Sequence, residues 1–158
     1  MKLLIPSAKE LNEQARIVEP QPLSENTKTI LQALRAFSLE ELATFYGISE
    51  ERALVEKERI DALIDGTAKT YPALELFDGL MYRSIERQDL SQKEQTYLQE
   101  HLLITTALYG VLPAYKGIAP HRLDFMMKLK PAGKSLKEFW KEDYDQAVEG
   151  EEQILSLL

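Results

Sequence analysis

The stretch Leu102–Leu112, LLITTALYGVL, decides the fold of this chain. Its apolar, β-branched and aromatic residues are typical of a central strand. The later stretch Leu123–Leu129 (LDFMMKL) predicts a strand that pairs beside it. Near the start of the chain, Lys2–Ile5 is a short apolar run closed by Pro6, which predicts a buried first strand.

Helices are expected between and after these strands. Ser24 is positioned to cap a helix whose apolar residues keep helical spacing through Phe37. Ala73–Ile85 predicts a short helix and then a strand through Leu80 and Tyr82. Three further helix starts carry the capping box, a Ser followed three residues later by Glu: Ser38/Glu41, Ser91/Glu94 and Ser135/Glu138. The pattern predicts an α+β fold, a mixed sheet with flanking helices.

The segment 38–65 predicts a helical hairpin within this fold. Its turn, Tyr46-Gly47-Ile48-Ser49, resembles a helix-hairpin-helix element, in which backbone N–H groups at Gly47, Ile48 and Ser49 hold a DNA phosphate. Charge argues for the alternative, an ordinary helical hairpin. Ser38–Ile64 has seven acidic and three basic residues, and two glutamates already occupy the positive end of the second helix.

Composition excludes several classes of site. The chain has 158 residues, a formal charge of -7 and no cysteine, so it has no disulfide, thiolate nucleophile or Cys-ligated metal. Its two histidines, His101 and His121, are distant in sequence, so we expect no metal site and no cofactor. Nucleophile-elbow, P-loop and dinucleotide-binding motifs are absent, which favours a protein that is not an enzyme without deciding the question.

The apolar segments are too short for a membrane protein. No window approaches the ~20 apolar residues of a membrane helix, and the amino terminus lacks the apolar stretch of a signal peptide. We therefore expect a cytoplasmic protein that has no membrane partner.

Positive charge is concentrated in one block of this acidic chain. Leu103–Lys141 has seven Lys/Arg and two Asp/Glu, whereas the other residues include twelve basic and twenty-four acidic groups. Basic and aromatic side chains of the block could line a nucleic-acid groove: Tyr109, Tyr115, His121, Arg122, Lys128, Lys130 and Lys134. The alternative is a cluster of solvated charges. Lys9, just after the first strand, is a further candidate to bind an anion at a sheet edge.

Several short blocks together resemble the YaaA peroxide-stress protein family. They run in order along the chain: Ala8-Lys9, Phe77 with Gly79 and Tyr82, Leu108–Leu112, Pro120 with Arg122 and Leu123, Gly133-Lys134, and Phe139-Trp140. The chain departs from the family pattern at Asp78, where a lysine is usual, and at Pro113, where the family segment carries an arginine. His121 stands in place of a tyrosine and could regain a charge only below its pKa, which is near 6.5 for an unperturbed histidine.

The resemblance implies a cytoplasmic bacterial protein of the oxidative stress response to hydrogen peroxide. It implies a DNA-binding protein with a positively charged cleft and a helix-hairpin-helix element, which limits iron-linked damage without an established reaction. The matched positions give the candidate site residues: Lys9, Tyr82, Tyr109, Gly110, Arg122 and Lys134. The chain corresponds to one domain, 1–158, expected to be the first two-thirds of a longer family member and an incomplete copy of the fold.

Three functions follow as hypotheses. The first is DNA binding through the basic cleft. The second is an enzyme acting on a nucleotide or base in the same pocket, with Arg122 holding a phosphate and Asp124 as general base. The third, direct iron binding, is not expected because the sequence has no paired ligand motif of the di-iron bundles. The sequence leaves the oligomeric state open.

Overall fold

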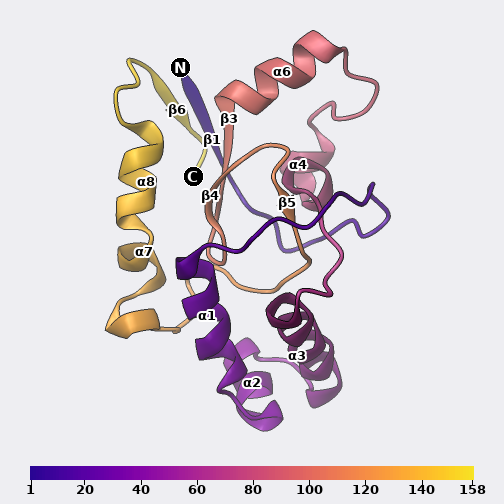
Figure 1. Ribbon diagram of the computed structural model, residues 1–158, viewed down its shortest axis with the longest axis vertical. Coiled ribbons are helices and arrows are strands. Elements are labelled where there is room, and N and C mark those ends of the chain that lie inside the picture. The colour runs from indigo at the N-terminus through magenta and orange to yellow at the C-terminus, as the bar shows by residue number, and fades with distance from the viewer.

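A mixed four-stranded sheet organises the computed structural model, which covers Met1–Leu158 (Figure 1). The strand order is β4-β3-β1-β6. The bounds of these strands are β1 (Lys2–Pro6), β3 (Leu102–Thr106), β4 (Gly110–Pro113) and β6 (Ile154–Ser156). Strand β1 pairs parallel with β3 and β6, whereas β3 and β4 form an antiparallel hairpin. A second, two-stranded sheet joins β2 (Tyr71–Pro72) to β5 (Gly117–Ile118).

Eight α-helices and a 3-10 turn surround the sheets, which confirms the α+β fold class. Their bounds are α1 (Glu25–Arg35), α2 (Leu39–Tyr46), α3 (Glu50–Asp65), α4 (Ala73–Leu76), α5 (Leu80–Arg83), α6 (Gln92–His101), η1 (Pro131–Gly133), α7 (Leu136–Phe139) and α8 (Lys141–Val148). All three predicted capping boxes are present, at the starts of α2, α6 and α7. No helix has the length and apolarity needed to cross a bilayer.

Two apolar cores hold these elements together. The first lies among α1, α2 and α3, which gather at one end of the molecule in Figure 1, and it includes Leu108, Leu123 and Trp140. The second lies against the sheet and includes Ile5, Phe77, Tyr82 and Ile104. Strand β5 contributes Ile118 to the second core, and the segment that follows it contributes Ala119, Leu123 and Leu129 to the first.

Three predictions about strands were wrong. Leu102–Leu112 is a hairpin rather than one strand, because the chain turns at Ala107–Tyr109, where the Thr106 hydroxyl accepts a hydrogen bond from the Tyr109 N–H. Leu80–Tyr82 lies in helix α5, which places the Tyr82 ring in the second core. Leu123–Leu129 is irregular, since its buried leucines pack against helices instead of pairing with a strand.

The last residues dock on the sheet through their backbone. Residues Ile154–Ser156 form β6, which pairs with β1. The side chains of Ile154, Leu155 and Leu157 stay exposed.

Candidate functional site

A cleft of about 820 Å³ lies where three distant segments meet. One wall is the loop after β1, Ser7–Lys9; another is the end of α2, Thr44–Tyr46; the third is the segment His121–Lys128, with Phe77 also lining the cleft. The volume is within the range of ~300–1,000 Å³ typical of sites for small ligands.

The fold brings the first wall to this place through β1. Because β1 and β3 run parallel, the residues that follow β1 lie at the edge where β3 turns into β4. The Ser7 N–H donates to the Thr105 carbonyl at 3.1 Å, and the buried Tyr82 hydroxyl donates to the Pro6 carbonyl at 2.7 Å. These two bonds fix the start of the loop that carries Lys9.

Three cations in the cleft have no hydrogen-bond or ion-pair partner. Lys9, Arg122 and Lys128 are exposed, and none of them forms an ion pair or a hydrogen bond. Asp124 is the only acid in the lining, and its Oδ1 accepts the Met126 N–H at 2.8 Å. The cleft therefore carries a formal surplus of positive charge on a molecule whose net charge is -7.

Arg122 is supported by an aromatic ring. Its guanidinium carbon lies 5.9 Å from the centre of the Tyr46 ring, a cation–π geometry. Burial, and then the nearby Glu56 carboxylate, raise the pKa of Tyr46, so its hydroxyl stays protonated at neutral pH. Tyr46 thus presents a neutral face to Arg122 and leaves the cation free for a ligand.

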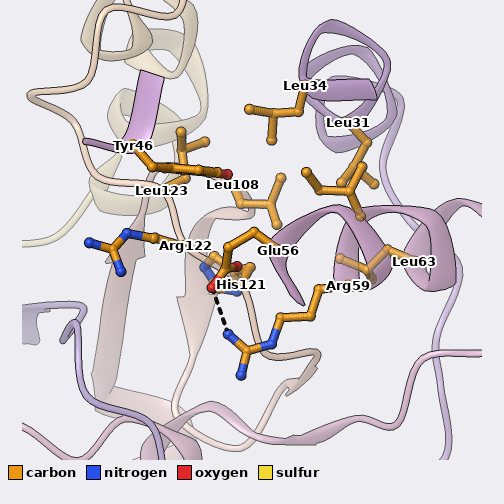
Figure 2. Close-up of a pocket in the computed structure, with 11 residues that line it drawn as sticks. Leu31, Leu34, Tyr46, Glu56, Arg59, Leu63, Leu108, His121, Arg122 and Leu123 are labelled. Atoms are coloured by element: carbon orange, nitrogen blue, oxygen red, sulfur yellow. Dashed lines mark hydrogen bonds and ion pairs between the residues drawn. The ribbon is translucent and has the colours of Figure 1, made fainter. Parts of the chain in front are cut away.

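A buried ion pair lies behind the cleft, on helix α3. The Glu56 side chain is 9% exposed and accepts a hydrogen bond from Arg59 at 3.0 Å, while Arg59 also contacts Glu13 at 3.0 Å. Burial raises the pKa of Glu56, although the charges of Arg59 and Arg122 oppose that effect. Figure 2 shows this pair with Tyr46 and His121 around a cavity of about 10 Å³, which is room for about one water molecule.

His121 connects the small cavity to the cleft, since it lines both. Its Nδ1 lies 2.8 Å from the Ala119 carbonyl, which can only accept, so Nδ1 carries the hydrogen and Nε2 is left as an acceptor. The ring packs edge-on against Tyr109 and Phe77, with centroid distances of 5.3 and 6.2 Å.

Burial lowers the pKa of His121 to about 4, and the Ala119 bond opposes this only in part. This pKa is below the unperturbed value near 6.5, so His121 adds no charge to the cleft at neutral pH.

The structure brings together two of the six candidate site residues, Lys9 and Arg122. Tyr109 lies behind them: its hydroxyl accepts the Ala119 N–H at 3.0 Å, which fixes the backbone that holds His121. Tyr82 is in the core and makes no contact with the cleft space.

The other two candidates lie elsewhere. Gly110 begins β4 with a φ of +75° and lies against the Trp140 ring. Lys134 is exposed beside a separate hollow over α7 and α8, whose lining includes several glutamates.

The α2–α3 turn has few free backbone donors. The N–H groups of Gly47 and Ile48 donate to the carbonyls of Thr44 and Ala43, at the end of α2. Ser49 caps α3 by accepting the Arg52 N–H. The hairpin contributes the end of α2, including Tyr46, to the lining of the cleft.

Glu56, Arg59 and Tyr46 were not predicted as residues of the site. One signal was available for Glu56, which shares its helical spacing with the apolar residues Ala53, Ile60 and Leu63. An acid on the apolar face of a helix predicts a buried, paired carboxylate. For Arg59 and Tyr46, nothing in the sequence separates them from ordinary surface and core residues. No group of three or more His, Asp or Glu side chains is arranged to hold a metal ion.

Comparisons with known proteins identify relatives over the whole chain. The family described as "Peroxide stress protein YaaA" matches residues 1–158. The chain is 57% identical to a UPF0246 protein of Streptococcus gordonii and 57% identical to one of Streptococcus sanguinis. A UPF0246 protein of Streptococcus pneumoniae is 54% identical. Each comparison covers 100% of this chain and 65% of the relative, so the chain spans slightly less than two-thirds of their length.

Proposed function

This chain belongs to the YaaA peroxide stress protein family, and from that premise we propose that it protects DNA during peroxide stress by binding it in the cleft of Lys9, Arg122 and Lys128. The observation that carries the proposal is the unpaired state of these three cations around one hollow. DNA carries one phosphate per nucleotide, and release of the counterions condensed on it favours binding to clustered cations.

The cleft suits unpaired DNA better than a duplex. Its lining interleaves the three cations with the half-buried Phe45 ring and two methionines, whereas Tyr46 is buried beneath Arg122. Base stacking on aromatic rings contributes about 1–3 kcal/mol per base in single-strand binding. A duplex keeps its bases stacked inside, so it would meet only the rim of the hollow. We therefore propose single-stranded or locally opened DNA as the ligand.

Fluorescence anisotropy with a labelled single-stranded oligonucleotide tests this function. Affinity should fall steeply as salt rises, and Arg122→Ala should lower both the affinity and the salt dependence, reducing the slope of log K against log salt by about 0.7. Lys134→Ala is the matched control, since it removes an exposed cation outside the cleft. Binding that ignores salt, or equal losses in the two variants, would contradict the proposal.

Limitation of iron-linked damage would follow indirectly. Ferrous iron and peroxide produce radicals that cleave DNA, and a protein that covers unpaired segments shields them. Protection of single-stranded DNA from cleavage by ferrous iron and peroxide should therefore be present with the unaltered protein and weaker with Arg122→Ala. Equal protection by both would indicate that iron, rather than DNA, is the target.

A second candidate function, an enzyme acting on a nucleotide or base, is favoured by one observation. Arg122 and Asp124 line the same cleft, so a cation and a candidate general base face one ligand space. If this function holds, Asp124→Asn should abolish turnover of the nucleotide while binding is kept. Absence of turnover across nucleotides and damaged bases by the unaltered protein would dismiss it.

A further inference from the structure

Methionine is the only sulfur-containing residue type in this chain. It has four methionines and no cysteine, so thiolates, which peroxide attacks most readily, are absent. Met126 is 81% exposed, far more than Met1 at 45%. Met81 and Met127 are partly buried and pack against the two cores. Among the thioethers, Met126 is therefore the most open to a dissolved oxidant.

Met126 is also part of the candidate DNA-binding cleft. It lines the hollow together with Lys9, Arg122 and Lys128. A local turn presents it there: Asp124 Oδ1 accepts the Met126 N–H at 2.8 Å, and the Asp124 carbonyl accepts the Met127 N–H at 3.2 Å. The turn directs Met127 toward the core and leaves Met126 in solvent. The exposure of Met126 thus comes from defined backbone contacts.

We propose that Met126 is a modification site for hydrogen peroxide, and that its sulfoxide weakens nucleic-acid binding in the cleft. The second half of this inference rests on the proposed function. The thioether sulfur attacks one peroxide oxygen, the O–O bond breaks and a sulfur–oxygen bond forms. Sulfur loses two electrons, and the peroxide is reduced to water, which carries away both peroxide protons.

Oxidation of Met126 changes the polarity of the cleft wall that a base would contact. The thioether is apolar and polarisable and makes favourable contacts with aromatic rings. The sulfoxide is polar, and its oxygen accepts hydrogen bonds, so it competes with phosphate for cations of the cleft. We expect affinity for a single-stranded oligonucleotide to fall about fivefold, the scale of one lost sulfur–aromatic contact.

The test combines peptide mass spectrometry with anisotropy on the same peroxide-treated samples. Fragment-ion spectra, which distinguish the adjacent Met126 and Met127 within one peptide, should show Met126 gaining one oxygen before Met127 and Met81 do, and affinity should fall in step with that gain. Met126→Leu removes the sulfur that peroxide oxidises, so the affinity of this variant, whatever its starting value, should be the same before and after treatment. Met126→Gln, polar like the sulfoxide, should bind weakly without peroxide. Met127→Leu, the matched neighbour, should remain sensitive to peroxide.

The contrary outcomes distinguish failure of this inference from failure of the proposed function. Slower oxidation of Met126 than of Met81, unchanged binding after full oxidation, or a Met126→Leu protein that still loses affinity with peroxide each overturns this inference alone. Failure of the untreated protein to bind any oligonucleotide overturns the proposed function and, with it, the effect on binding. The order of oxidation in the mass spectra then still decides whether Met126 is the preferred site.

Discussion

Individual residues at the cleft are held by contacts that leave their functional atoms free. His121 uses Nδ1 to bind the Ala119 carbonyl and keeps Nε2 available. Arg122 rests on the Tyr46 ring without forming an ion pair. Such preorganisation lowers the entropic cost of binding a ligand, because these side chains already have defined positions.

The protonation of His121 gives a prediction at this scale. Burial lowers its pKa to about 4, whereas the unfolded chain binds a proton near pH 6.5. Between these values the unfolded state gains a proton that the folded state lacks, so stability falls as pH falls, by about 3 kcal/mol for this residue. The raised pKa of Glu56 acts in the opposite direction, because the folded state then binds the extra proton.

The variant His121→Gln isolates this effect, since glutamine can donate to the Ala119 carbonyl and does not titrate. Urea unfolding from pH 7 to pH 4 should show the unaltered protein losing stability relative to the variant. Parallel pH profiles for the two proteins would mean that the His121 pKa is not lowered.

Gly110 gives a second residue-scale prediction, of destabilisation. A Cβ atom here would lie 2.6 Å from Trp140 Cε3, and the φ of +75° is unfavourable for any L side chain. Gly110→Ala should lower the free energy of unfolding by about 3 kcal/mol, combining strain and overpacking. Gly133→Ala is the control, because its φ is +77° with nothing within 4 Å; it should cost about 1 kcal/mol. Equal losses would show that the Trp140 contact is unimportant.

Among the elements, helix starts could be predicted from the sequence and strand pairing could not. A capping box is local, since Ser38 and Glu41 satisfy each other within four residues, and all three boxes are present. Pairing depends on distant partners. Leu80–Tyr82 has an apolar composition that suits a strand, but it lies in helix α5. Tyr82 packs into the second core from that helix. The strand predicted at Leu123–Leu129 was wrong for the same reason, because its buried leucines pack in the first core.

The cap of α2 gives a prediction at the scale of the element. Ser38 accepts the Glu41 N–H, and the Glu41 carboxylate accepts the Ser38 N–H. Ser38→Ala should lower the free energy of unfolding by about 1 kcal/mol. It should also weaken binding in the cleft, because α2 positions Tyr46 beneath Arg122. Glu41→Gln, which can keep the reciprocal bond, should change stability less. Urea unfolding of the three proteins measures the changes in stability, fluorescence anisotropy measures the change in binding, and identical curves would contradict the prediction.

On the scale of the whole molecule, basic residues that are neighbours in the sequence are divided between separate hollows. The basic block Leu103–Lys141 supplies Arg122 and Lys128 to the cleft, but its Lys134 lies on another face. Lys9 joins the cleft from the opposite end of the sequence because β1 lies beside β3. Lys9, Arg122 and Lys128 were thus predictable as residue types, while their convergence depends on sheet topology.

The central claim is that Ser7–Lys9, Thr44–Tyr46 and His121–Lys128 form one surface that binds anionic nucleic acid. Mapping of backbone amide chemical shifts by NMR during titration with a short oligothymidylate tests it most directly. The account predicts that the three segments shift together along one binding curve, and that the curve weakens with added salt. Shifts centred on Lys134 and Lys141, or none in the three segments, would contradict it.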